Sequence, residues 1–210
     1  MKNWEIFCTF AAMNEIKWTE NVILADADYV DGVAFDLTVN FERMLGRRVP
    51  LADMAQWVEC VALDGGLKEG ENETQVVLVH RRECDRMQNF APGAYKDELD
   101  GKAFSGRLGE FVFTAVQTEE MATKEDLLLD TLQLVCAQPE VKRLMLVVPE
   151  SLLDDVRQLL RRQESDERRT TVFTMQPAPG GAFRQEMLGF SLLAALGISS
   201  QEIEEKLTKQ

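Results

Sequence analysis

The feature that most constrains the fold of this chain is an alternation between two kinds of segment. Short, continuous apolar runs alternate with longer segments whose apolar residues recur every three or four positions. The first kind is typical of buried strands and the second of helices that present one apolar face. Five runs predict strands: 21–26, 74–80, 110–116, 143–148 and 170–175. Within the first of these runs, residues 22–25 are all apolar, which predicts that residues 22–26 form a strand covered on both faces at the centre of the sheet.

Helices are expected between these strands and after the last one. The helical spacings fall at 33–45, 51–61, 123–138, after Pro149, and in the C-terminal region. Residues suited to the first turn or to the cap of these helices are Asp31, Pro50, Thr123, Ser151 and Ser199. Strands that alternate with helices of this length indicate β-α-β crossovers and therefore parallel strand pairing.

The predicted fold class is α/β. We expect a Rossmann-like three-layer sandwich with a mostly parallel central sheet of about five strands and helices on both faces. Residues 1–210 are expected to form a single domain, with a C-terminal helical hairpin at about 183–208 packed on it. The connection 81–109 contains five glycines or prolines among mixed charges and is expected to have little regular structure. It is either a lid over a site or a surface excursion.

Composition restricts the classes of function. The chain has 36 acidic and 23 basic residues, a formal net charge of −13, which disfavours nucleic-acid binding except by a nuclease of the kind considered below. The four cysteines are scattered without zinc-ligand spacing, so neither a zinc site nor a disulfide framework is indicated. No apolar run reaches the roughly twenty residues that cross a bilayer, and no secretory leader is recognisable. A cytoplasmic protein without membrane contact is expected.

Acidic residues follow the first predicted strand. Asp26 and Asp28 come at its end, where α/β sheets place their ligand crevices. Carboxylates gathered at one strand end could coordinate a hard cation such as Mg²⁺ or Mn²⁺. The alternative is structural, with Asp31 capping the next helix and Asp28 stabilising the turn, which leaves Asp26 without a role.

A second acidic group opens the helix predicted after the third strand. Asp126 and Asp130 are four residues apart and therefore share a helix face, from which they could complete a metal site opposite Asp26. The structural alternative makes Asp126 the capping-box partner of Thr123. Both hypotheses stay open at this point.

Two short stretches resemble the NYN domains of the PIN-like nuclease group. Residues 23–30 (ILADADYV) are similar to the opening strand of that group, and residues 124–130 (KEDLLLD) are similar to the start of its central acidic helix. The resemblance implies that Asp26, Asp28, Asp126 and Asp130 correspond to magnesium ligands of a ribonuclease. Tyr29 stands where the group has asparagine, and residues 147–150 (VVPE) replace its Ser-Gly-Asp-x-Asp-Phe signature.

The whole chain also resembles an uncharacterised family of unknown function from gut Bacteroidetes. Two functions follow from these comparisons. The first is a degenerate NYN/PIN-like binding or interaction module, favoured by the departures from the nuclease signature. The second is a Mg-dependent nuclease or phosphoesterase that uses the acidic cluster. The large apolar residues between Phe183 and Leu207 must pack on the sheet or on another subunit, so a homodimer through the C-terminal helices is a candidate assembly.

Overall fold

The computed structural model describes residues 17–120, 122–163, 167–177 and 180–208. Its strands are β1 (Asn21–Asp26), β2 (Ala52–Asp53), β3 (Glu73–His80), β4 (Phe90–Ala91), β5 (Ala103–Gly106), β6 (Gly109–Gln117), β7 (Arg143–Val147), β8 (Arg169–Thr174) and β9 (Arg184–Met187). Its α-helices are α2 (Ala27–Leu45), α3 (Met54–Asp64), α4 (Lys124–Cys136), α5 (Leu153–Arg162), α6 (Leu188–Ala195) and α7 (Ser200–Leu207). A π-helical turn at Tyr95–Leu99 and a 3-10 turn at Glu150–Leu152 complete the elements.

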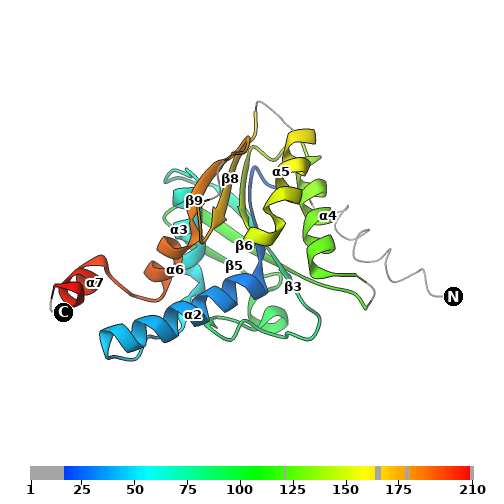
Figure 1. The fold of residues 1–210 in the computed structure, drawn as a ribbon. Coiled ribbons are helices and arrows are strands. Elements are labelled where there is room, and N and C mark those ends of the chain that lie inside the picture. Colours follow the sequence, from blue (N-terminus) through cyan, green and yellow to red (C-terminus); the bar gives the residue numbers. More distant parts are fainter. Residues whose placement is uncertain (1–16, 121, 164–166, 178–179, 209–210) are drawn as a thin grey trace.

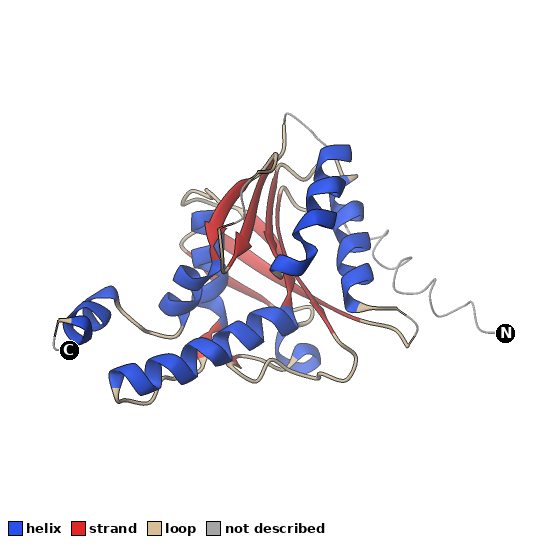
Figure 2. Cartoon of the chain, viewed as in Figure 1, coloured by secondary structure: helices blue, strands red, loops and turns tan. Residues whose placement is uncertain are grey.

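The main sheet has seven strands in the order β5-β6-β3-β1-β7-β8-β9. Figure 2 shows the strands in red between the helices. All neighbours are parallel except β5 and β6, which confirms the α/β class and the mostly parallel sheet. β1 lies between β3 and β7, so its predicted central place is confirmed. The expectation of about five strands is too low, because β5 and β9 are four-residue edge strands without a continuous apolar run.

Helices cover both faces of this sheet and give three layers (Figure 1). Alternate residues of the strands feed two separate apolar cores, as the two-residue period of a strand requires. One core lies between the sheet and α2, α3 and α6. The other lies between the sheet and α4 and α5. The central strands run parallel, so the side chains that follow them gather at the same edge of the sheet.

Three of the expected helix starts are wrong. α2 begins directly after β1 and is capped by Asp26, because the chain turns from strand into helix without a connecting loop. α3 begins at Met54 with Asp53 as its cap, and Pro50 lies before the short strand β2. Ser151 lies within the 3-10 turn that precedes α5, and no side chain caps that helix. Thr123 and Ser199 cap α4 and α7 as expected.

The connection after β3 is more ordered than expected. It contains β4, the π-helical turn and β5, and the carboxylate of Asp31 fastens it to α2 by accepting the backbone N–H groups of Gln88 and Asn89. The region expected as a helical hairpin at 183–208 begins instead with strand β9 and continues as α6 and α7. Within the described residues, no helix combines the length and the apolar character that crossing a membrane would require.

Candidate functional site

A cavity of about 820 Å³ opens at the carboxyl ends of β1, β3, β6 and β7. Strands are added to one side of β1 first and then, from β7 onward, to the other side, so the order reverses beside β1. In open α/β sheets ligands bind outside the carboxyl ends of the strands at such a reversal. The charged residues that line the cavity are Asp26, Asp28, Arg81, Arg82, Glu83, Glu119, Glu120, Lys124 and Glu125.

Asp26 is the most deeply placed of these residues, and its side chain is 0% exposed. Its Oδ1 accepts the backbone N–H of Tyr29 at 2.9 Å, which caps α2, and lies 2.7 Å from the Lys124 ammonium. Its other oxygen, Oδ2, is buried and has no hydrogen-bond partner among the described residues. Burial raises the pKa of the Asp26 carboxyl, while Lys124 opposes that rise.

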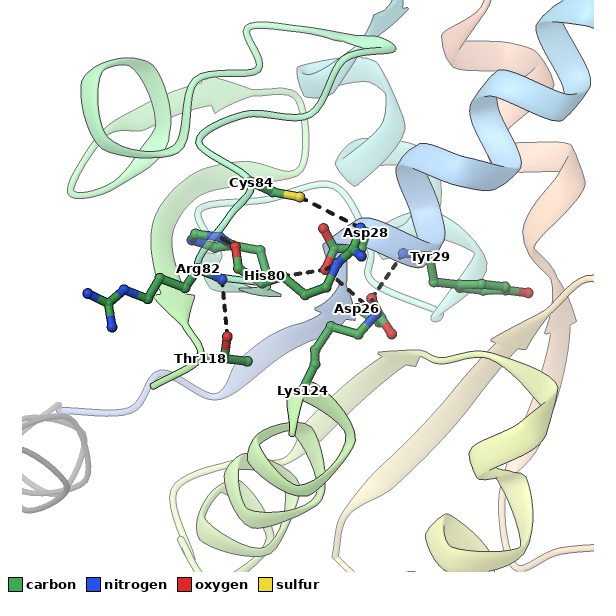
Figure 3. Close-up of polar contacts among 9 residues, drawn as sticks. Asp26, Asp28, Tyr29, His80, Arg82, Cys84, Thr118 and Lys124 are labelled. Carbon is green, nitrogen blue, oxygen red and sulfur yellow. Dashed lines mark hydrogen bonds and ion pairs between the residues drawn. The ribbon is translucent and has the colours of Figure 1, made fainter. Parts of the chain in front are cut away.

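Lys124 lies at the start of α4 and extends toward the end of β1 (Figure 3). Its Nζ is 2.7 Å from Asp26 Oδ1 and 3.7 Å from Asp28 Oδ2, and its side chain is only 13% exposed. Asp28 also accepts hydrogen bonds from the backbone N–H and from Nε of Arg81. The first two predicted ligands are thus brought together, and an ammonium group from this chain bridges them.

Asp126 and Asp130 lie elsewhere on α4. Asp126 Oδ2 accepts the hydroxyl of Thr123 at 2.6 Å, and the backbone N–H of Asp126 donates to Thr123 Oγ1. The structural alternative proposed for Asp126 is therefore present. No contact joins either residue to Asp26 or Asp28 within the described part of the chain.

These carboxylates do not fit a ready-made cation site. In the described ranges no three His, Cys, Asp or Glu side chains converge closely enough to hold a metal ion. A magnesium ion needs several oxygen ligands in near-octahedral geometry. Instead, the Lys124 ammonium pairs with both Asp26 and Asp28 and neutralises part of their negative charge.

His80 is the last residue of β3, directly before Arg81. Its ring stacks on Tyr95 with centroids 3.7 Å apart and planes 8° from parallel. Its Nδ1 lies 3.0 Å from the carbonyl oxygen of Arg81. Burial lowers the pKa of His80, and the ring is only 5% exposed. The stacked pair thus anchors the turn that presents Arg81 to the cavity.

Tyr29 and Glu150 join α2 to the end of β7. The Tyr29 hydroxyl donates to Glu150 Oε2 at 3.2 Å, and Glu150 Oε1 accepts the backbone N–H groups of Met175 and Gln176. Burial and the Glu150 carboxylate raise the pKa of Tyr29. The carboxylate therefore ties together the segments that follow β1, β7 and β8.

Reasoning from the sequence missed Lys124, Arg81 and Glu150. Lys124 has one local signal, since it is a cation placed in the first turn of a helix, where the helix dipole favours acids. A cation at this unfavourable position indicates that an acidic partner lies outside the helix. Arg81 and Glu150 carry no comparable signal, because each depends on the pairing of strands distant in sequence.

The profile of a family of unknown function (DUF6621) matches residues 15–203. The match spans most of the chain, so this protein belongs to that family. Neither the curated proteins nor the solved structures include a match to the chain.

Proposed function

We propose that this family member is a Rossmann-like binding module that takes a small, positively charged ligand in the cavity at the carboxyl edge of the sheet. Its parallel strands, numbered by their order in the chain, run 3-2-1-4-5-6, which is the order of doubly wound nucleotide-binding folds. The observation that carries the proposal is the Lys124 ammonium between Asp26 and Asp28. The Lys124 ammonium therefore occupies the position that a catalytic metal ion would need.

The N-terminus of α2, next to this position, argues against a dinucleotide as the ligand. In nucleotide-binding folds of this order, a glycine-rich turn leaves the N-terminus of the first helix open for the pyrophosphate. Here the Asp26 carboxylate occupies the N-terminus of α2, and the turn reads Asp26-Ala27-Asp28. A phosphate at that point would meet a buried negative charge.

The charge of the cavity favours a cationic ligand. Six acidic and three basic side chains line it. Asp26, Asp28 and Glu120 are paired with Lys124, Arg81 and Arg82 in that order. With three more acidic than basic side chains in its lining, the cavity has an excess of negative charge, which attracts an amine or guanidinium group.

A thermal-melting titration tests the charge preference. Spermidine, a polyamine, should raise the melting temperature of the protein above that in sodium chloride of equal ionic strength, because a ligand that binds the native state stabilises it. Glu83→Gln with Glu125→Gln removes two cavity charges and should abolish the shift. Glu69→Gln with Glu71→Gln removes two exposed acids outside the cavity and should preserve it. No shift beyond that in sodium chloride, or equal shifts in both double variants, would contradict the proposal.

The Mg-dependent nuclease alternative rests on one observation, the buried and unpartnered Oδ2 of Asp26. A metal could use this oxygen only after displacing Lys124, with Asp28, Asp126 and Asp130 as the other predicted ligands. That alternative requires Mg²⁺ or Mn²⁺ to raise the melting temperature of the wild type but not of Asp26→Asn. A binding module that is neutralised by Lys124 should show no metal-induced shift in either protein.

We further propose that the protein works in the cytoplasm as a single domain. Cys60, Cys84 and Cys136 are free thiols, and a reducing compartment keeps such thiols reduced. Phe190 and Leu207 leave 70% and 62% of their surface exposed and support a homodimer through the C-terminal helices. The domain and dimer proposals are tested by the predictions in the Discussion.

A further inference from the structure

Three consecutive strands of the sheet begin with arginine. Arg143 opens β7, Arg169 opens β8 and Arg184 opens β9. All three strands are parallel, so these residues gather at the amino edge of the sheet, opposite the cavity described above. Arg143 is the direct register partner of Arg169, and Arg184 is the partner of Thr171.

The register also places the three arginines on one face. Paired residues of neighbouring strands point to the same side, and residues two apart on one strand share a side. Arg143 and Arg169 are therefore on the same face, and Arg184 joins them through Thr171. Met145 and Phe173, which follow two and four residues later in their strands, belong to the core beneath α2, α3 and α6. The arginines thus lie on the side of the sheet that faces α3.

A cavity of about 420 Å³ lies at this point. Arg143, Arg168, Arg169 and Arg184 line it together with two threonines, two glycines, Ala182 and Phe183. Among the described residues, no acidic side chain lines it. In a chain of net charge −13, a cavity with four arginines in its described lining is a local reversal of the prevailing charge.

The guanidinium groups converge on the turn after α3. A Cβ added to Gly66 would lie 3.1 Å from Arg143 Nη1 and 4.0 Å from Arg184 Nη1. Arg143 Nη1 donates to the carbonyl oxygen of Gly65 at 2.7 Å, whereas its Nε is buried without a hydrogen-bond partner among the described residues. A buried donor without a partner costs free energy and calls for an acceptor.

Nearby acids neutralise this group only in part. Glu186 forms an ion pair with Arg184, and Asp64 lies close enough to Arg184 and Glu186 to feel both charges. Arg168 has other partners. It donates to the carbonyl oxygens of Cys136, at the end of α4, and Gln163, directly after α5. Arg143 and Arg169 remain as directly opposed like charges, an arrangement that is destabilising in a sheet. Burial and the neighbouring Arg169 both lower the pKa of Arg143.

We propose that this cavity is a binding site for an oxyanion, the phosphate group of a small phosphorylated ligand. Planar guanidinium groups match the oxygens of phosphate with paired hydrogen bonds, and here Arg143, Arg169 and Arg184 supply them from adjacent strands. The anion relieves the repulsion between the opposed arginines. Phe183 and Ala182 give the cavity an apolar wall for the rest of the ligand. This site is independent of the cationic-ligand proposal, because it lies at the other edge of the sheet.

Inorganic phosphate is the probe for the test. Phosphate should raise the melting temperature of the protein above that in sodium chloride of equal ionic strength, and binding should be measurable by calorimetry. Arg169→Gln and Arg184→Gln each remove one exposed guanidinium and should weaken phosphate binding about tenfold. Arg161→Gln removes an arginine of α5 that is also exposed but does not line the cavity, and this variant should bind phosphate like the wild type.

Several results would overturn the proposal. No phosphate effect beyond that of sodium chloride would show that the arginines need no anion. Equal weakening in Arg161→Gln would show that phosphate responds only to overall charge. A short single-stranded RNA that binds more tightly than phosphate, and that loses affinity in Arg161→Gln as well, would replace the cavity by an extended basic surface.

Discussion

Asp26 shows how one residue links the fold to the candidate site. It is the last residue of β1, it caps α2, and it pairs with Lys124 on α4. The sequence predicts the strand end but leaves Asp26 without a structural role, whereas the structure makes it the cap of α2. The sequence does not predict the pairing with Lys124, because that contact depends on α4 packing against the sheet from 98 residues away. Breaking such a buried pair at one partner typically costs about 3–5 kcal/mol.

Asp31 shows the opposite outcome. Its residue type and position before an apolar periodic segment favour a helix cap, yet α2 begins four residues earlier. Its carboxylate instead accepts two backbone N–H groups of the connection after β3. Capping and long-range anchoring use the same carboxylate chemistry, so residue type alone cannot distinguish them.

We predict that His80 makes stability depend on pH below neutrality. Burial lowers the pKa of His80 in the folded state below the ordinary 6.5. The unfolded state then binds the proton more readily, so stability should fall as pH drops through 6.5 toward the folded pKa. The slope from one such group is at most about 1.4 kcal/mol per pH unit. Urea unfolding between pH 7.5 and 5 measures it.

The matched variant for this prediction is His80→Phe. Phenylalanine keeps a ring against Tyr95 and removes the titrating group. Because His80 is the only histidine in the chain, the difference between the two stability curves isolates its contribution. Parallel curves for the wild type and His80→Phe over this pH range would rule out the effect.

At the scale of elements, the central strands could be predicted and the edge strands could not. β1, β3 and β7 are buried on both faces and have the continuous apolar runs that this burial requires. β5 and β9 read AFSG and RQEM, and their burial is mostly partial or absent. An edge strand is specified by its neighbour's free backbone groups more than by its own side chains, so its sequence carries little signal.

We predict that the two C-terminal helices differ sharply in their contribution to stability. Leu188 and Leu192 of α6 are fully buried, whereas α7 has no buried residue and is held by the Arg47–Glu202 ion pair and the half-buried Ile203. Deleting residues 200–210 should therefore cost about 1 kcal/mol. Leu192→Ala should cost about 3 kcal/mol through the cavity it leaves. Chemical denaturation measures both.

The same deletion tests the homodimer. Leu207 leaves with α7, while Phe190 on α6 stays exposed. If α7 contributes to a dimer, sedimentation should show a dimer for the full chain and a monomer for the shortened one. A full chain that sediments as a monomer would reject the dimer, and a deletion that costs as much as Leu192→Ala would reject the peripheral role of α7.

At the scale of the whole molecule, the two edges of the parallel sheet carry opposite chemistry. The carboxyl edge holds the acidic cavity around Asp26, and the amino edge holds the arginines that open β7, β8 and β9. The net charge of −13 shows neither feature, because it averages over both edges. The pairs Arg168-Arg169 and Arg161-Arg162 look alike in the sequence. Only the strand register shows that Arg169 lies beside Arg143 at the amino edge of the sheet.

We predict that residues 21–195 unfold as one cooperative unit with β1 as its most protected strand. Residues 22–25 of β1 are fully buried and lie between β3 and β7, so their amides should exchange with solvent only through global unfolding. β5 and β9 close the two edges of the sheet and should open locally at lower free energy. Native-state hydrogen exchange with increasing denaturant distinguishes these classes, since amides of β1 should follow the global transition and those of β5 and β9 should not. Both apolar cores share the strands of this single sheet, so neither can melt while the other survives. Two separate unfolding transitions, or a β9 as protected as β1, would show that the two sides of the sheet fold as independent units.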